Sequence, residues 1–419
     1  MNRRRFLYGA SLLPFAATVR GMVPAFEPKR LSASMWIYLW DFADEGYENI
    51  FRRLQENGLT AVSLASAYHA GKFLLPHNPK RKVIFLEDGT VYFQPTSSLY
   101  GRIKPKVNSL VAQGDSLATV KRHADKAGMQ TNTWVVCCHN TPLGTEYPDI
   151  ACVNAFGDSI PQNLCPANHD VRSYLRAVVR DIAGHGVGRI ELEAMQFQGY
   201  AHGFHHEREG IPLSAATRFL LGLCFCPSCI KRATAESVDI GGVRIFTRQT
   251  LEALFLQPAT VNERYAALAD LPEDRFRPFL EWRTRVVASL AEELMESVQG
   301  TNVELRPLVS IDPTARTMVG IDPERIAKIT GGILVPGYVK DGTALRNPLK
   351  NIQAAIGKAE LILGFQIGLP ESGGRPEFLD RLKTARELGV TSFNFYNYGF
   401  VPYENFGWIK EGLEAAEGL

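Results

Sequence analysis

The feature that most constrains the fold is an alternation of short apolar runs with amphipathic segments, repeated eight times along the chain. We predict strands over Ser34–Trp40, Ala61–Ala67, Gln130–Val136, Arg189–Ala194, Val303–Ser310, Gly332–Val335, Leu361–Ile367 and Ser392–Tyr396. Apolar residues at helical spacing follow most of these runs. Eight strand–helix units favour an α/β fold of the (β/α)8 TIM-barrel type over an open, doubly wound sheet.

Glycines indicate where several of the predicted helices end. Gly58, Gly128, Gly186 and Gly389 each stand directly after a helical pattern and shortly before a predicted strand. Glycine readily adopts the left-handed backbone conformation that commonly follows the last turn of a helix. The positions of these glycines therefore support the alternation of helices and strands.

Two segments interrupt the repeat. Residues 82–93 hold Asp88-Gly89 between two apolar runs, which predicts a β-hairpin after the second strand. The segment of about 195–300, after the fourth strand, has a long helical pattern. Insertions that follow barrel strands lie at the face where barrel enzymes form their active sites. We therefore expect one barrel domain over residues 28–419, with insertions after strands 2 and 4.

The N-terminus resembles an export signal. Arg3, Arg4, Phe6 and Leu7 match the Arg-Arg-x-Phe-Leu pattern of twin-arginine signals, and a general secretory signal is the alternative. The apolar run that follows, Gly9–Val19, is too short to span a bilayer. We therefore predict that residues 1–27 are a signal peptide and that the mature protein is exported, to the periplasm in a bacterial cell.

The charge balance argues against two classes of partner. Forty-six Lys and Arg residues against 44 Asp and Glu residues give a net charge of +2. Without a marked positive excess, we expect no nucleic-acid partner and no membrane partner once the signal is removed. No glycine-rich phosphate-binding loop is present in the sequence. Self-association into an oligomer is compatible with the composition.

The cysteines include one compact group. Cys224, Cys226 and Cys229 form a Cys-x-Cys-x-x-Cys motif, and three thiolates at this spacing suit a tetrahedral zinc site with a fourth ligand from elsewhere. In an exported protein the alternative is a disulfide with additional buried thiols. Cys137 and Cys138 end a predicted strand and are expected in the core.

At this point the sequence resembles a known family, the glycoside hydrolase family 42 β-galactosidases. The resemblance covers residues 163–232: a cysteine in Asn-Leu-Cys-Pro-Ala-Asn-His, a strand that ends in Glu193, and then Cys-x-Cys-x-x-Cys. It implies a structural zinc site formed by Cys165, Cys224, Cys226 and Cys229. It also implies that Glu193 is the general acid/base. The family has Asn-Glu where this chain has Leu192-Glu193, and the segment between Glu193 and Cys224 is longer here.

Hydrolysis of a glycosidic bond requires two carboxyl groups, one on each side of the bond. Alternation along a strand places Glu191 and Glu193 on the same side, with Glu193 nearer the strand end. We take Glu193 as the first catalytic carboxyl. The resemblance implies a nucleophilic glutamate at the end of strand 7, but Gln366 stands there. Glu371 is our first candidate for the second carboxyl, and Asp312 is the runner-up.

Aromatic and polar residues gather at the predicted ends of four strands. Aromatic rings pack against the apolar faces of sugars, and amide, carboxylate and imidazole groups bind their hydroxyls. We therefore predict substrate contacts from Trp36, Trp40, Asp41, Tyr68, His69, Trp134, Asn140, Asn394 and Tyr396.

These residues favour an exported glycoside hydrolase that cleaves O-glycosyl bonds of a carbohydrate substrate. A metal-dependent sugar isomerase or epimerase is an alternative, with ligands from Glu193, His69, Asp312 and the histidine-rich segment His202, His205 and His206. A barrel that binds carbohydrate without catalysis is a third reading, because Gln366 replaces the expected carboxylate.

Overall fold

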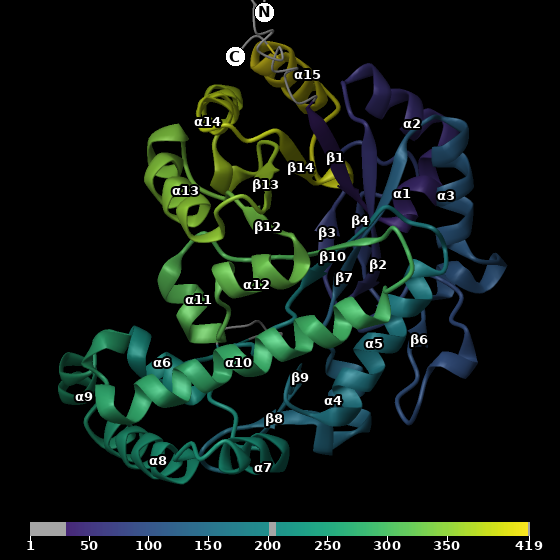
Figure 1. The fold of residues 1–419 in the computed structure, drawn as a ribbon. Helices are drawn as coiled ribbons and strands as arrows, with labels where there is room; N and C mark the ends of the chain where they lie inside the picture. Colours follow the sequence, from purple (N-terminus) through teal and green to yellow (C-terminus); the bar gives the residue numbers. More distant parts are fainter. Residues whose placement is uncertain (1–30, 201–206, 418–419) are drawn as a thin grey trace, which may run out of the picture. The chain divides into compact units, whose positions relative to one another are not determined.

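The computed structural model describes residues 31–200 and 207–417, and its core is a closed barrel of parallel strands (Figure 1). The barrel strands follow the order β11-β10-β7-β2-β1-β14-β13-β12. Leu308 and Leu334 form a parallel bridge between the two ends of this order, and Val309 N–H donates to Leu334 O at 2.8 Å. The (β/α)8 TIM barrel is therefore confirmed. The strands are β1 (Ser32–Ile37), β2 (Ala61–Tyr68), β7 (Gln130–Val136), β10 (Arg189–Glu193), β11 (Glu304–Pro307), β12 (Gly332–Pro336), β13 (Glu360–Gln366) and β14 (Ser392–Tyr396).

Helices connect the barrel strands, and those of the fourth connection group together next to the long helix α10 (Figure 1). They are α1 (Leu39–Glu45), α2 (Tyr47–Glu56), α3 (Ser116–Lys126), α4 (Thr141–Glu146), α5 (His169–Ala183), α6 (Ala215–Leu221), α7 (Pro227–Ala235), α8 (Ile240–Leu256), α9 (Pro258–Arg264), α10 (Glu273–Ser297), α11 (Pro313–Val319), α12 (Pro323–Thr330), α13 (Gly342–Ile356), α14 (Arg375–Glu387) and α15 (Glu404–Glu417). Within the described ranges, none of them is both long enough and apolar enough to cross a membrane.

The predicted helix ends are confirmed by the backbone. Gly58, Gly128, Gly186 and Gly389 have φ angles of +79°, +67°, +70° and +81°, the left-handed region in which a Cβ is unfavourable. A fifth glycine, Gly364 on β13, has a packing role. A Cβ at that position would lie 2.9 Å from Cη2 of Trp36, so its absence makes room for the indole inside the barrel.

The predicted first strand extends too far. It ends at Ile37, and Trp40 and Asp41 belong to the first turn of α1. The reason is a local cap: Tyr38 N–H donates to the Asp41 carboxylate at 3.1 Å, which stabilises the start of the helix. The predicted fifth strand is also too long, since β11 ends at Pro307.

The predicted hairpin over 82–93 is wrong. β4 (Val83–Phe85) pairs with β3 (Lys72–Leu74), whereas β5 (Thr90–Val91) pairs with β2 and with β6 (Lys106–Val107). Ala70 N–H donates to the Asp88 carboxylate at 2.9 Å. Asp88-Gly89 therefore connects two different sheets instead of turning one hairpin.

Two further strands, β8 (Ala151–Val153) and β9 (Ser159–Leu164), form an antiparallel hairpin between α4 and α5. The predicted signal peptide, residues 1–27, lies outside the described residues, and so do His202, His205 and His206.

Candidate functional site

Glu191 lies fully buried inside the barrel and is saturated by hydrogen bonds. Its carboxylate accepts from Trp36 Nε1 at 2.7 Å, Ser63 Oγ at 2.8 Å, Asn394 Nδ2 at 2.9 Å and Arg189 Nε at 3.1 Å. Burial raises the pKa of Glu191, and Arg189 with the other donors opposes that rise. Because both of its oxygens already accept hydrogen bonds, this carboxylate supports the barrel interior. Trp36 and Asn394, which we expected to contact substrate, are buried with it.

Glu193 lies one pleat nearer the end of β10 and has a different environment. Its Oε2 accepts a hydrogen bond from Trp134 Nε1 at 2.6 Å, and its Oε1 accepts none from the residues that the structure describes. Burial raises the pKa of Glu193, while the charge of nearby His69 and the Trp134 hydrogen bond act in the opposite direction. A half-buried carboxyl with a raised pKa and one free oxygen has the properties of a general acid.

Aromatic rings surround this carboxyl. The Tyr68 ring centroid lies 4.8 Å from that of Trp134, and Tyr396 lies 6.0 Å from Trp134 in an edge-on arrangement. The His69 ring stacks between Tyr68 at 4.3 Å and His139 at 4.5 Å. The structure therefore brings together four of the predicted substrate contacts, Tyr68, His69, Trp134 and Tyr396, around the predicted acid.

The remaining predicted contacts have structural roles at the starts of two helices, α1 and α4. Trp40 is buried and stacks on Tyr38 with ring centroids 4.2 Å apart. Asp41 caps α1, as described above. Asn140 caps α4 by accepting from Leu143 N–H at 3.0 Å, and its Nδ2 donates to Gly89 O at 3.1 Å.

The structure separates the two candidates for the second carboxyl. Glu371 lies in a short 3-10 helix after β13 (Pro370–Ser372), where Gln366 Nε2 donates to its Oε1 at 3.1 Å. The hydroxyl of Tyr396 lies within electrostatic reach of both Glu193 and Glu371. Burial raises the pKa of Tyr396 to about 12, and both carboxylates contribute to this rise. The register also pairs Gln366, the hydrogen-bond donor to Glu371, with Tyr396, so Glu193 and Glu371 each lie in the neighbourhood of Tyr396.

Asp312, the runner-up, is exposed and caps a helix. Its Oδ1 accepts from Thr314 N–H at 2.7 Å and from Ala315 N–H at 3.3 Å at the start of α11. No hydrogen bond or ion pair joins it to Glu193 in the part of the chain that the structure describes. The geometry thus favours Glu371 over Asp312.

One residue of this neighbourhood was missed at the level of sequence. Tyr338 follows β12, its ring centroid lies 6.1 Å from that of Tyr396, and 42% of the residue is exposed. Its position two residues after the strand was the available signal. It was not recognised because Pro336-Gly337 separates it from the apolar run.

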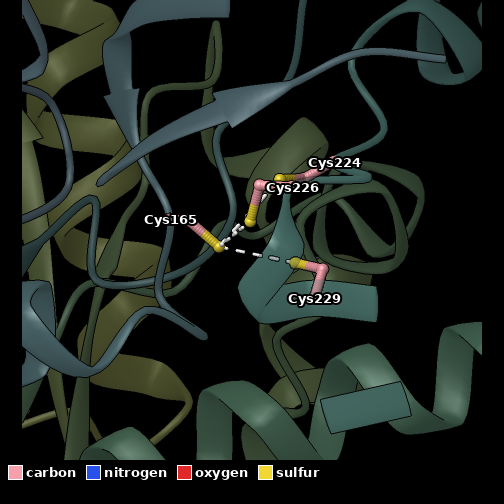
Figure 2. Close-up of side chains that lie close together, drawn as sticks. All are labelled: Cys165, Cys224, Cys226 and Cys229. Atoms are coloured by element: carbon pink, nitrogen blue, oxygen red, sulfur yellow. Dashed lines mark hydrogen bonds between the residues drawn. The ribbon is translucent and has the colours of Figure 1, made fainter. Parts of the chain in front are cut away.

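Four buried cysteines converge in a second site (Figure 2). The sulfur atoms of Cys165, Cys224, Cys226 and Cys229 all lie within 4.8 Å of one another. From Cys165 Sγ the distances are 3.4 Å to Cys229, 3.6 Å to Cys226 and 4.0 Å to Cys224. A disulfide requires about 2.05 Å. Four sulfurs around a tetrahedral zinc ion with Zn–S bonds of about 2.3 Å would be separated by about 3.8 Å. The donor set and the spacing therefore fit zinc.

A buried arginine near the four cysteines also fits a zinc ion at this site. Arg283 is only 2% exposed, and Nη1 donates to Met318 O at 2.8 Å, but it forms no ion pair within the described ranges. Burial lowers its pKa to about 10, while the nearby cysteine sulfurs favour its charged form. An unpaired buried cation is costly. A zinc ion with four thiolates carries a net charge of −2 and would supply the missing counter-charge.

Cys152 is a fifth buried thiol beside this cluster. It lies on β8 and interacts with the sulfurs of Cys165 and Cys224. Its neighbour Val153 donates its N–H to Cys224 Sγ at 3.5 Å, which anchors the strand to the cluster. Its spacing in the sequence gave no indication of this position, because the β8–β9 pairing brings it there. Cys137 and Cys138 are buried in the core, as predicted.

No protein-family model matches the chain, and no curated protein is similar to it in sequence. Solved structures with a similar fold include glycosidases. The glycoside hydrolase domain of PgaB (BpsB) from Bordetella bronchiseptica matches with a TM-score of 0.55 at 12% identity, over 88% of this chain and 95% of that domain.

Two β-galactosidases are also similar in fold. The enzyme of the Antarctic haloarchaeon Halorubrum lacusprofundi has a TM-score of 0.59 at 11% identity, over 93% of this chain and 58% of that one. The enzyme of the psychrophilic Marinomonas ef1 has a TM-score of 0.55 at 9% identity, over 92% and 59%. This chain thus spans less than two thirds of either β-galactosidase. At such identities the likeness shows a shared barrel fold.

Proposed function

We propose that this protein hydrolyses glycosidic bonds, with Glu193 as the general acid. The observation that carries the proposal is the Glu193 carboxyl itself. It has a raised pKa and a free Oε1, and it lies among Tyr68, Trp134 and Tyr396 at the carboxyl end of a barrel strand. Active sites of TIM barrels form at this end. The fold shared with glycosidases supports the same reaction class.

In this proposal, the protonated Glu193 donates its proton to the glycosidic oxygen as the bond from that oxygen to the anomeric carbon breaks. Glu371 supplies the second carboxylate. It either attacks the anomeric carbon or removes a proton from an attacking water. Gln366 donates to Oε1 of Glu371 and orients it, which leaves Oε2 without a hydrogen bond from the described residues. The aromatic rings pack against the sugar and exclude water from the bond that breaks.

We also propose that Cys165, Cys224, Cys226 and Cys229 hold a structural zinc ion. The cluster joins the start of α5 to α7 and to the β8–β9 hairpin, which are distant in sequence. Zinc there would stabilise the insertion after β10 and would take no part in the reaction. With residues 1–27 as a twin-arginine signal, the protein would fold and take up zinc before it is exported.

A barrel that binds carbohydrate without cleaving it is the second candidate. Gln366 at the end of β13 and the exposure of Glu371 favour it. The isomerase alternative takes histidine ligands from residues 202–206, which lie outside the described residues. Among the residues that the structure describes, the cysteine quartet is the only group of His, Cys, Asp or Glu placed to hold a metal ion.

The test is hydrolysis of a panel of nitrophenyl glycosides and polysaccharides by the full chain without residues 1–27. The Glu193→Gln variant and a control, Glu304→Gln, are measured beside it. Glu304 lies on β11 with a half-exposed side chain, at the opposite end of the strand from the site. We expect hydrolysis that the first substitution removes and the second leaves intact. Binding of a glycan without turnover by the unaltered protein would establish the second candidate instead.

A further inference from the structure

The hairpin of β3 and β4 has two different faces. On one face, the Phe73 ring packs against Phe400 at 4.6 Å and against Tyr38 at 5.6 Å. The register pairs Leu74 with Val83 and Lys72 with Phe85 on the other face. The exposed fractions of Leu74, Val83 and Phe85 are 66%, 47% and 74%. Three large apolar side chains thus form one solvent-exposed patch. Single exposed apolar residues are common on protein surfaces, whereas a contiguous patch indicates a binding surface.

The segment that forms this patch also holds four cations. Residues 72–85 hold Lys72, Lys80, Arg81 and Lys82 and contain no Asp or Glu. The side chain of Asp44 underlies the segment, 2.7 Å from Arg81 Nε and 3.7 Å from Lys80 Nζ. One carboxylate therefore opposes four cations, which leaves an excess of three positive charges.

Two carboxylates just beyond the hairpin, Glu87 and Asp88, offset part of this charge, so that residues 72–88 together with Asp44 hold four cations and three anions. Glu87 is engaged by the backbone N–H of Ser109 at 3.2 Å, and Asp88 by the backbone N–H of Ala70. Lys72 forms no ion pair with any described residue. The hairpin patch, defined as Lys72, Leu74, Lys80, Lys82, Val83 and Phe85, therefore combines three exposed apolar side chains with three lysines of the same segment.

We propose that the hairpin patch docks on the surface of an anionic phospholipid bilayer. Apolar side chains that enter the headgroup region, with lysines against anionic lipids, are the combination that holds proteins at such surfaces. A second copy of the chain is a poorer occupant, because two copies of this patch would bring like charges together. The near-neutral net charge led us to expect no membrane partner, since it averages over a locally charged surface.

The consequence concerns where the barrel works. Phe73, on the inner face of the hairpin, contacts Tyr38 and Phe400, and Tyr38 lies 5.2 Å from Tyr68 at the candidate active site. Docking through the outer face would therefore hold the mouth of the barrel close to the lipid. This inference does not depend on the proposed glycosidase activity, because it concerns binding alone.

The test is co-sedimentation of the chain, without residues 1–27, with vesicles of phosphatidylcholine alone and with vesicles that also contain phosphatidylglycerol. We expect binding only to the anionic vesicles, and its loss at about 1 M salt, where the screening length falls to about 3 Å. The variant Leu74→Ser/Phe85→Ser should bind at least about tenfold more weakly. Lys72→Glu should bind at least about fivefold more weakly.

The control is Ile245→Ser/Leu256→Ser, which removes two exposed apolar side chains from α8, at 59% and 83% exposure. It should bind anionic vesicles as the unaltered chain does. Equal melting temperatures of the variants would show that loss of binding is not loss of folding. Three results would overturn the proposal: no vesicle binding by the unaltered chain, equal loss in the α8 variant, or a hairpin variant that changes only the oligomeric state.

Discussion

Replacing Glu191 by glutamine keeps the size of the side chain but removes the negative charge inside the barrel. Oε1 accepts from Ser63, Asn394 and Arg189, and Oε2 accepts from Trp36. The best orientation of a glutamine places its carbonyl oxygen where Oε1 of Glu191 lies. Its NH2 group then faces the Trp36 N–H, so two donors meet and one hydrogen bond is lost. Arg189, whose side chain is 7% exposed, loses its counter-charge as well.

The magnitude follows from these two losses. A hydrogen bond to a charged group contributes about 1.5–3 kcal/mol, and breaking a buried ion pair costs about 3–5 kcal/mol. The desolvation that raises the pKa of Glu191 is relieved in the variant, which offsets part of the cost. We therefore expect the free energy of unfolding to fall by about 3 kcal/mol. The urea midpoint, followed by circular dichroism at neutral pH, measures this change if the slope stays constant.

The matched control is Glu304→Gln. It removes a carboxylate that is 3.2 Å from Arg306 and 50% exposed, while the second partner of Arg306, Glu360, stays at 2.7 Å. Because half of the Glu304 side chain is exposed and Arg306 keeps its second partner, the Glu304–Arg306 pair should contribute less than about 1 kcal/mol. A loss below about 1 kcal/mol in Glu191→Gln would refute the reasoning, since it would mean that Glu191 is not the buried anion on which its donors converge.

Three further perturbations follow from the structure. Trp134→Phe removes the Nε1 hydrogen bond that stabilises the Glu193 carboxylate, so its pKa should rise and the alkaline limb of kcat/KM should move up by about one pH unit. Cys229→Ser should abolish zinc binding, measured as metal content, and lower the melting temperature. His185, 2.7 Å from Asp115, has a raised pKa, so its contribution to stability is present below an unfolded pKa of about 6.5 and lost above the folded one. His185→Gln should therefore reduce the free energy of unfolding more at low pH than at high pH.

Each of these has a result that contradicts it. If the alkaline limb of the kcat/KM profile stays in place in Trp134→Phe, the group that titrates in that limb is not Glu193. Full zinc content in Cys229→Ser, or its loss in the core control Cys138→Ser, would refute the quartet. A pH-independent effect of His185→Gln would show that its ion pair does not form.

The fold was predictable because its signals are local and repeated. The alternation of strands and helices and the glycines after the helices require no knowledge of distant residues, and the closed barrel follows from them. The hairpin over 82–93 failed for the converse reason. Asp88-Gly89 indicates that the chain bends there, but β4 pairs with β3, which precedes it. The Asp88 carboxylate accepts a hydrogen bond from Ala70 N–H, a contact that the sequence does not indicate.

The site divides in the same way. The place of Glu193 at the end of β10 was predictable, because strand alternation and position determine where it points. The role of Glu191 was not predictable, because its donors Trp36 and Asn394 stand 155 and 203 residues away along the chain. Trp36 and Asn394 follow the same composition rule as Trp134 and Tyr396, yet they point into the interior. Only the packing distinguishes residues that line the mouth of the barrel from those beneath it.

The most direct test of the central claim compares leaving groups in the Glu193→Gln variant. A general acid is needed when the departing alcohol is poor, as in a natural glycoside, and is dispensable when the leaving group is a dinitrophenolate. We expect the variant to lose about 10²–10⁴-fold in kcat/KM on the former and little on the latter. An equal loss on both substrates would contradict the assignment of Glu193 as the acid, and full activity on both would place the chemistry elsewhere.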